Sequence, residues 1–301
     1  MGPLRAMLGA LAAALLLAPS PGFAADPCAD YVPQPKPRNA GRDVVGQDLD
    51  TILDRGFMRF AVYEDFPPYS WMEGTEPRGV DVEIARLIAG EIGVAPRFDF
   101  VAAGETLDTD LRSYLWKGPV VGGSVSNVMM RVPYDSAFKC RVEQVVFTGQ
   151  YAGEGIAIAY REAEYPDGGP VPAYFRFDTV AVENDSISDF YLTSFAGGQT
   201  AAGVRRYPTM AEAMAALNSG EVMAAMGPLA QLEWGRGEGV AIHEPPLAGL
   251  AKARWTLGVG VHFAYRALGY AVDDAISAGL QDGRIAAIFA SYGLSHAMPE
   301  R

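Results

Sequence analysis

The chain has 301 residues, 50% of them hydrophobic, and a formal net charge of −12 at pH 7. This length is enough to bury a sizeable core in one or two domains. The acidic balance disfavours nucleic acids and anionic membranes as partners, because both carry negative charge themselves.

The first 25 residues are typical of a secretory signal peptide. One basic residue, Arg5, precedes an apolar run over residues 6–18, and Ala24 and Ala25 provide the small residues of a cleavage site. The run is too short and wrongly flanked for a membrane span. We therefore expect an exported protein without a membrane anchor.

Residues 26–45 contain several prolines and few large apolar side chains, so we expect an extended arm there. Cys28 in this arm and Cys140 are the only cysteines of the chain. In an oxidising compartment two thiols usually pair or stay buried. We predict that these two form a disulfide.

The first folded unit begins with a strand and an aromatic loop. Residues 57–63 form a dense apolar run, as expected of a strand buried on both faces of a parallel sheet. Phe66, Tyr69 and Trp71 then surround two prolines, which fix the backbone near the rings. Open α/β sheets bind ligands at this carboxyl end of their strands.

An amphipathic helix is predicted next, because apolar residues recur at three- and four-residue steps over residues 80–92 and Gly93 closes the run. Strand, loop and helix together resemble the opening of the family 3 periplasmic solute-binding proteins. The matching stretches are Glu64 to Trp71, Gly79-Val80-Asp81-Val82-Glu83-Ile84-Ala85 and Glu91-Ile92-Gly93-Val94.

The resemblance implies the two-lobed α/β fold of type II periplasmic binding proteins, in which two crossings between the lobes give a hinged cleft. We expect lobe one at residues 46–154 and 258–301, and lobe two at residues 155–257. The crossing strands are expected at 155–160 and 255–261.

The remaining elements follow from periodicity and from glycine or proline stops. Lobe one should also contain helices at 48–55 and 105–117, strands at 97–101 and 120–123, and two closing helices split at Asp282-Gly283. Lobe two should contain strands at 179–183, 205–207 and 222–226, a helix capped by Thr209 and ended by Gly220, and loops at 162–175 and 233–239.

The segment from Ser124 to Arg141 departs from the family. Family members run from the third strand straight into a short helix, whereas this chain carries additional residues, among them 127–135. We expect these residues to be an insertion that faces the ligand end of the sheet.

The resemblance implies that Phe66 and Tyr69 contact the ligand, with Trp71 close by. The alternative role of these rings is packing between the lobes. The family's carboxylate-binding arginine, which forms a bidentate bond, falls at Arg141. Arg131, within the insertion, could reach the same place, so both arginines remain candidates.

Further ligand-binding candidates are Glu64 and Ser124 in lobe one, and Asp185 and Ser186 at the start of a lobe-two helix. Family members carry Gly-Thr-Thr at that helix start, where free amide groups favour an anion. A carboxylate at Asp185 would repel one. The aspartate that holds an amino group in the family falls at Pro228, so we do not expect a standard amino acid as ligand.

The sequence contains none of the motifs typical of nucleophilic, phosphate-binding or zinc chemistry, so we predict no enzyme, no cofactor and no metal. His243, His262 and His296 lie far apart in the sequence, and the methionines at Met210 and Met214 sit at core-like positions of a helix.

The predicted function is a periplasmic solute-binding protein that closes two lobes on a small organic ligand, with an ABC permease as its partner. One alternative is an accessory protein of a periplasmic quinoprotein (PQQ) alcohol or methanol dehydrogenase system, and thus a role in methylotrophy. Another is a periplasmic dehydratase like cyclohexadienyl dehydratase. It would need a carboxylate acid or base in the cleft, for which Glu64, Asp65 and Glu183 are the candidates.

Overall fold

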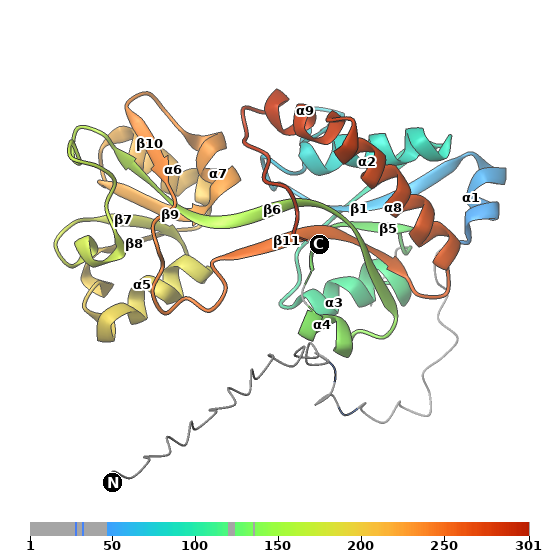
Figure 1. Cartoon of the computed structure of the whole chain (residues 1–301), viewed down its shortest axis with the longest axis horizontal. Helices are drawn as coiled ribbons and strands as arrows, with labels where there is room; N and C mark the ends of the chain where they lie inside the picture. Colours follow the sequence, from blue (N-terminus) through green and yellow to red (C-terminus); the bar gives the residue numbers. More distant parts are fainter. Residues whose placement is uncertain (1–27, 29–31, 33–46, 120–123, 135, 301) are drawn as a thin grey trace, which may run out of the picture.

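The computed structural model describes residues 28, 32, 47–119, 124–134 and 136–300. They form two α/β lobes joined by two long strands, β6 and β11, which run side by side from one lobe to the other (Figure 1). The predicted signal peptide, most of the proline-rich arm and the strand expected at 120–123 lie outside the described residues.

The lobe-one sheet is built around β1. Its strands are β4 (Ala95–Val101), β1 (Phe57–Tyr63), β5 (Val128–Tyr134), β11 (Arg254–His262) and the first part of β6 (Val145–Arg161), in that order. One face is covered by α2 (Val80–Ile92), α8 (Arg266–Gln281) and α9 (Arg284–Ser291) (Figure 1). The other face is covered by α3 (Leu107–Leu111), its π-helical continuation η1 (Arg112–Trp116) and α4 (Ser136–Arg141).

Helix boundaries in lobe one agree with the local sequence signals. Helix α1 (Leu49–Arg55) begins after Asp48, whose carboxylate accepts a hydrogen bond from the Thr51 amide. Helix α2 ends at Gly93, which adopts the left-handed conformation that glycine tolerates best. The hairpin of β2 (Trp71–Glu73) and β3 (Glu76–Arg78), between the aromatic loop and α2, was not predicted.

The interpretation of residues 127–135 as an insertion is wrong. Residues 128–134 form β5, which pairs in parallel with β1 and antiparallel with β11. Met129 and Met130 are each 1% exposed. The segment is therefore part of the sheet core.

The first crossing is one continuous strand instead of a separate short one. Strand β6 spans 17 residues, pairs with β11 in lobe one and continues beside β9 and β10 in lobe two. The second predicted crossing corresponds to β11.

In lobe two the parallel strands are β9 (Ala224–Pro228), β7 (Val180–Glu183) and β8 (Val204–Tyr207), and β10 (Val240–His243) pairs with β6. Its helices are α5 (Ile187–Gly198), α6 (Met210–Ser219) and α7 (Leu229–Gly235), with short 3-10 turns η2 (Pro172–Arg176) and η3 (Ala201–Gly203). The Thr209 hydroxyl accepts from the Glu212 amide at 3.2 Å, which confirms the predicted cap. The loop expected at 233–239 instead begins with the last turn of α7, and β10 was not predicted.

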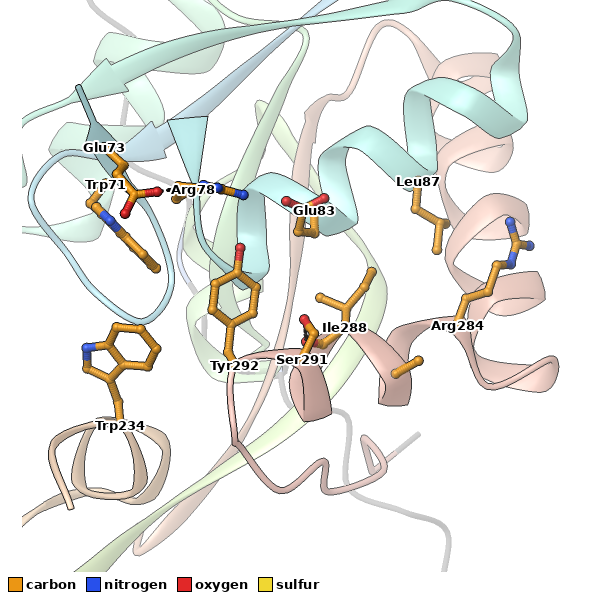
Figure 2. Close-up of a pocket in the computed structure, with 11 residues that line it drawn as sticks. Trp71, Glu73, Arg78, Glu83, Leu87, Trp234, Arg284, Ile288, Ser291 and Tyr292 are labelled. Carbon is orange, nitrogen blue, oxygen red and sulfur yellow. Dashed lines mark hydrogen bonds and ion pairs between the residues drawn. The ribbon is translucent and has the colours of Figure 1, made fainter. Parts of the chain in front are cut away.

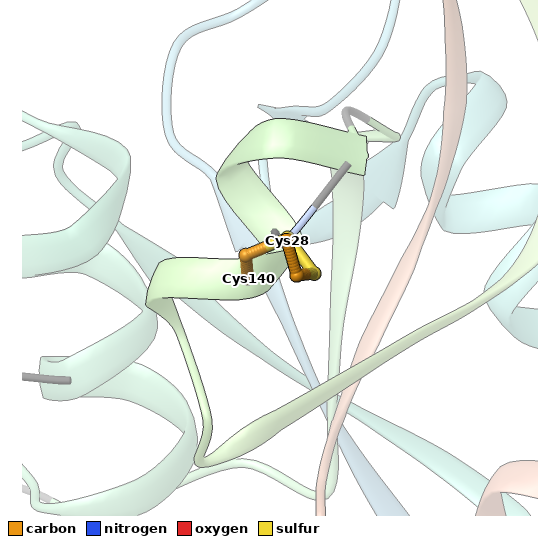
Figure 3. Close-up of a disulfide and its surroundings, with 2 residues drawn as sticks. All are labelled: Cys28 and Cys140. Carbon is orange, nitrogen blue, oxygen red and sulfur yellow. A yellow bond between two sulfur atoms is a disulfide. The ribbon is translucent and has the colours of Figure 1, made fainter. Parts of the chain in front are cut away.

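Cys28 and Cys140 form the predicted disulfide, with an S–S distance of 2.01 Å and a Cα–Cα distance of 5.5 Å (Figure 3). Cys140 lies in α4, so the bond attaches Cys28 to lobe one. None of the described helices is long and apolar enough to cross a membrane.

Candidate functional site

The aromatic loop is fixed tightly at the carboxyl end of β1. The Phe66 amide donates to the Ser70 carbonyl at 2.8 Å, and the Tyr69 amide donates to the Phe66 carbonyl at 2.9 Å. The Ser70 hydroxyl donates to the Tyr63 carbonyl at 2.6 Å. These bonds hold the backbone between Tyr63 and Ser70 in one arrangement.

The three predicted ligand-contacting rings lie in different environments. Tyr69 is 1% exposed and belongs to the lobe-one core. Phe66 is half-buried, with its ring 5.2 Å from that of Tyr69. Trp71 packs instead against Trp234 of α7. Phe66 and Trp71 are thus both partly open, and Phe66 is the one that lies against the buried ring of Tyr69.

Beneath the loop lies a buried ionic cluster, made of Tyr69, Asp81, Arg131, Tyr151 and Glu154. The Arg131 guanidinium lies 3.1 Å from the Tyr69 ring centroid and 3.5 Å from Glu154 Oε2. The Tyr69 hydroxyl donates to the same Glu154 oxygen at 2.7 Å. The Tyr151 hydroxyl donates to Asp81 Oδ1 at 2.7 Å.

Arg131 reaches this position through an irregularity in β5. The register between β5 and β11 shifts so that Met130 and Arg131 together oppose Val259, and Arg131 has a φ of 59°. A positive φ is uncommon for a residue other than glycine, and an extra residue in a strand re-aims the side chain beside it. The bulge thus directs the guanidinium toward Tyr69 and Glu154.

Burial controls the protonation of this cluster. It raises the pKa of Asp81 to about 6, although the Arg131 charge partly opposes the shift. It also raises the pKa of Tyr69 and of Tyr151, so both stay protonated and donate. Burial alone would lower the pKa of Arg131, but its anionic and phenolic neighbours outweigh this and the pKa is raised. Arg131 therefore remains a cation.

The two arginine candidates are clearly separated by the structure. Arg131 is in contact with the aromatic loop, with its guanidinium 5.5 Å from the Phe66 ring. Arg141 is exposed at the end of α4, with its guanidinium 5.4 Å from the Phe138 ring. Glu64 and Ser124 are also exposed.

The lobe-two candidates lie at the start of α5. The Ser186 hydroxyl caps the helix by accepting from the Asp189 amide at 3.1 Å. Asp185 is exposed with a φ of 58°, and its carboxylate accepts from the Asn184 side chain at 2.7 Å. A negative charge thus stands beside this helix start.

Two further lobe-two positions bear on ligand chemistry. Pro228 lies at the N-cap of α7 and offers no carboxylate to an amino group. Glu183 is half-buried at the end of β7, and burial raises the pKa of its carboxyl group.

The aromatic loop faces lobe two across a small pocket of ≈ 180 Å³. Pro67 lines it from lobe one, and residues of α6 and α7, among them Met210, Gln231 and Trp234, line it from lobe two. We call it the interlobe pocket. Sequence reasoning did not identify Met210 or Gln231 as facing the loop, because their positions are set by packing between the lobes.

Asp81, Tyr151 and Glu154 were also missed as site residues. Glu154 did carry a signal, since it is a lone carboxylate within the apolar run Ala152 to Ala159 of β6. A charge in such a strand needs a buried partner. Among the described residues, no group of three or more His, Cys, Asp or Glu side chains is placed to hold a metal ion.

No family model and no curated protein matches this chain. Several solved structures do match it. An ancestral cationic amino acid solute binding protein (AncCDT-1) is 20% identical with a TM-score of 0.67, covering 81% of this chain and 99% of its own. An amino acid ABC transporter substrate-binding protein from Streptococcus pneumoniae, bound to L-arginine, is 17% identical with a TM-score of 0.57, covering 83% and 100%.

A third similar structure is a mutant of ArgBP from T. maritima, at 19% identity and a TM-score of 0.54, covering 81% of this chain and 98% of its own. Matches at such low identity establish the architecture and leave the ligand open. This chain therefore has the two-lobed fold of the periplasmic amino-acid-binding proteins, as the sequence resemblance implied.

Proposed function

We propose that this protein is a periplasmic solute-binding protein that closes its lobes on a small organic ligand lacking the α-carboxylate of an amino acid. The observation that carries the proposal is that Arg131 is buried and already paired. Its side chain is 10% exposed and already faces Glu154. A ligand carboxylate would have to compete with that buried partner.

The competition is unfavourable on energetic grounds. Asp81 and Glu154 are 1% and 6% exposed, so removing Arg131 from them would leave buried carboxylates uncompensated. Breaking a buried charge pair costs about 3–5 kcal/mol. Asp185 adds repulsion from lobe two, so a neutral or cationic ligand suits both sides of the cleft better than an anion does.

The test compares ligands that differ only in the carboxylate. Thermal shift and calorimetry would be run with arginine against agmatine, lysine against cadaverine, and phenylalanine against phenethylamine. We expect each decarboxylated compound to bind at least as well as its amino acid. Sub-micromolar binding of any standard amino acid would contradict the proposal, because it would require a free carboxylate-binding cation.

Transport is the role that this fold supports best, with export to the periplasm and delivery to an ABC permease as further parts of the proposal. The similar protein from Streptococcus pneumoniae is an ABC transporter substrate-binding protein. Uptake of the bound compound by cells with and without this protein would test the role. Equal uptake would argue against it.

A dehydratase is a second candidate because of Glu183. One similar structure is described as a precursor of cyclohexadienyl dehydratase. Of the three carboxylates considered, Glu64 and Asp65 are exposed, whereas Glu183 is half-buried and its pKa is raised by burial, as a general acid requires. Loss of water from a cyclohexadienyl substrate, abolished in Glu183→Gln, would support this candidate.

The accessory role beside a quinoprotein dehydrogenase is a third proposal. It is favoured by large exposed aromatic side chains, since Phe177 is 86% and Phe190 61% exposed in lobe two. Exposed apolar side chains that form a contiguous patch often mark protein contacts. Co-purification with a periplasmic PQQ dehydrogenase, lost when both are replaced by serine, would support it.

A further inference from the structure

A second cavity borders the interlobe pocket at Trp234 and forms an open groove of ≈ 790 Å³ along lobe one (Figure 2). Helices α2 and α9 form its sides, and the β2–β3 hairpin closes one end. Trp234 of α7 reaches this end from lobe two. The volume falls within the range of small-molecule sites, roughly 300–1,000 Å³.

Three aromatic rings form a corner at that end. The ring centroids of Trp71 and Trp234 are 5.4 Å apart, those of Trp71 and Tyr292 5.8 Å, and those of Trp234 and Tyr292 6.2 Å. Their planes are inclined to one another by 48° to 77°. A flat ring in this corner can stack on one of them while meeting the edge of another, the two arrangements that aromatic pairs prefer.

The groove continues from the corner over an aliphatic surface. Leu87 of α2 and Ala287 and Ile288 of α9 line it. These side chains offer dispersion contacts and apolar area to the body of a ligand. The shape therefore suits an elongated or fused-ring compound better than a small polar one.

The charged residues along the groove are already paired. Arg78 binds Glu73 at 2.9 Å, and Glu83 is held by Arg86 at 2.6 Å. Arg284, at the far end, binds both Glu91 at 2.5 Å and Asp282 at 2.7 Å.

These pairs decide the charge of the occupant. A charged ligand would compete with one of these pairs for its counter-ion. An uncharged ligand leaves them intact.

Trp234 connects the groove to lobe two and to the interlobe pocket. It lines the interlobe pocket as well as the groove. The preceding residue, Glu233, accepts hydrogen bonds from the amide and hydroxyl of Ser295 in lobe one, at 2.9 and 2.7 Å. The aromatic corner is thus completed by lobe two and held in place by these bonds.

We propose that this groove binds an uncharged organic compound with a flat aromatic ring system, packed against the corner formed by Trp71, Trp234 and Tyr292. The groove shares Trp234 with the interlobe pocket, and its other lining residues are different. Lobe two takes part through Trp234.

The probe for the test is indole, with tryptamine and indole-3-acetate as its cationic and anionic counterparts, measured by isothermal titration calorimetry on the mature protein. Indole should bind about tenfold more tightly than either charged compound, equivalent to about 1.4 kcal/mol. Equal binding of all three, or no binding of indole, would overturn the proposal.

Two variants locate the binding. Ala287 is exposed and lines the groove, whereas the neighbouring Ala286 is exposed and does not. Ala287→Trp should fill the groove and abolish indole binding, and Ala286→Trp should leave it unchanged. The same effect from both variants would place the indole elsewhere.

The contribution of lobe two is tested with Trp234→Ala, with Tyr174→Ala as a control. The side chains of Trp234 and Tyr174 are 42% and 50% exposed, so both variant proteins should fold. Trp234→Ala should weaken indole binding about tenfold, and Tyr174→Ala should not. Unchanged affinity in Trp234→Ala would remove lobe two from the site.

Discussion

The guanidinium of Arg131 lies 3.1 Å from the ring centroid of Tyr69, and the Tyr69 hydroxyl in turn donates to Glu154 at 2.7 Å. These residues belong to three different parts of the fold: the bulge of β5, the aromatic loop and the crossing strand β6. The buried ionic cluster therefore joins the candidate ligand platform to the strand that links the lobes.

Replacing Arg131 by methionine should strongly destabilise the protein. The variant keeps an apolar side chain of similar length but leaves Asp81 and Glu154 buried without their cation, which costs about 3–5 kcal/mol. Urea unfolding measures the effect. The control is Arg141→Met, since Arg141 is exposed and its loss should cost less than about 0.5 kcal/mol. Equal effects of the two variants would show that the cluster does not stabilise the fold.

Stability should depend on pH through Asp81. Its pKa in the folded protein is raised to about 6 by burial, above the ordinary value of 3.8. Below pH 3.8 the Asp81 carboxyl group is protonated in both the folded and the unfolded protein, and its contribution to the free energy of unfolding is fully present. This contribution is lost as the pH rises through the pKa of the folded protein.

We therefore expect the free energy of unfolding of the wild type to fall relative to Asp81→Asn between pH 4 and pH 7. The relative change should be on the order of 3 kcal/mol. The amide side chain of that variant can still accept the Tyr151 hydrogen bond but does not titrate in this range. Denaturant unfolding at several pH values measures the difference, and parallel stability curves would contradict the raised pKa.

The parts of the fold that the sequence predicted well depend on local signals. Strand β1 was predicted from an apolar run and α2 from a helical period that stops at Gly93, although the β2–β3 hairpin between them was not. The closing helices α8 and α9 were predicted from the turn at Asp282 and Gly283. Each signal acts within a few residues, so tertiary contacts did not alter it.

The errors lie where distant contacts decide the structure. The apolar run of β5 has no flanking turn signal that identifies it as a central strand, and its position follows from pairing with β1 and β11. The choice between Arg131 and Arg141 depended on that strand. No local pattern marks an arginine with a positive φ, so sequence alone left both candidates open.

The disulfide should stabilise the mature protein by restricting its unfolded chain. Cys28 and Cys140 are 112 residues apart, and closing a loop of this size contributes roughly 4–5 kcal/mol in the chain-entropy model, with measured values commonly about 2–5 kcal/mol. A reducing agent should therefore lower the melting temperature of the wild type. The double variant Cys28→Ser, Cys140→Ser should melt at that lower temperature with or without reductant. Alkylation of both thiols in unreduced protein would refute the bond.

Phe66 should contribute to ligand binding more than to folding. Its ring is half-buried, with a fixed neighbour in Tyr69, so it loses little conformational entropy when a ligand covers it. Phe66→Ala should weaken binding of the physiological ligand by about 2 kcal/mol, as for an aromatic hot spot. A core ring would instead destabilise the fold by roughly 3–5 kcal/mol when removed.

Melting temperature and affinity are therefore measured together on Phe66→Ala. The matched control is Phe263→Ala, since Phe263 is 46% exposed and lies after β11, away from the aromatic loop. The control should change neither quantity appreciably. Loss of folding in Phe66→Ala would assign the ring to the core. Unchanged affinity with unchanged stability would leave the aromatic loop without a role in binding.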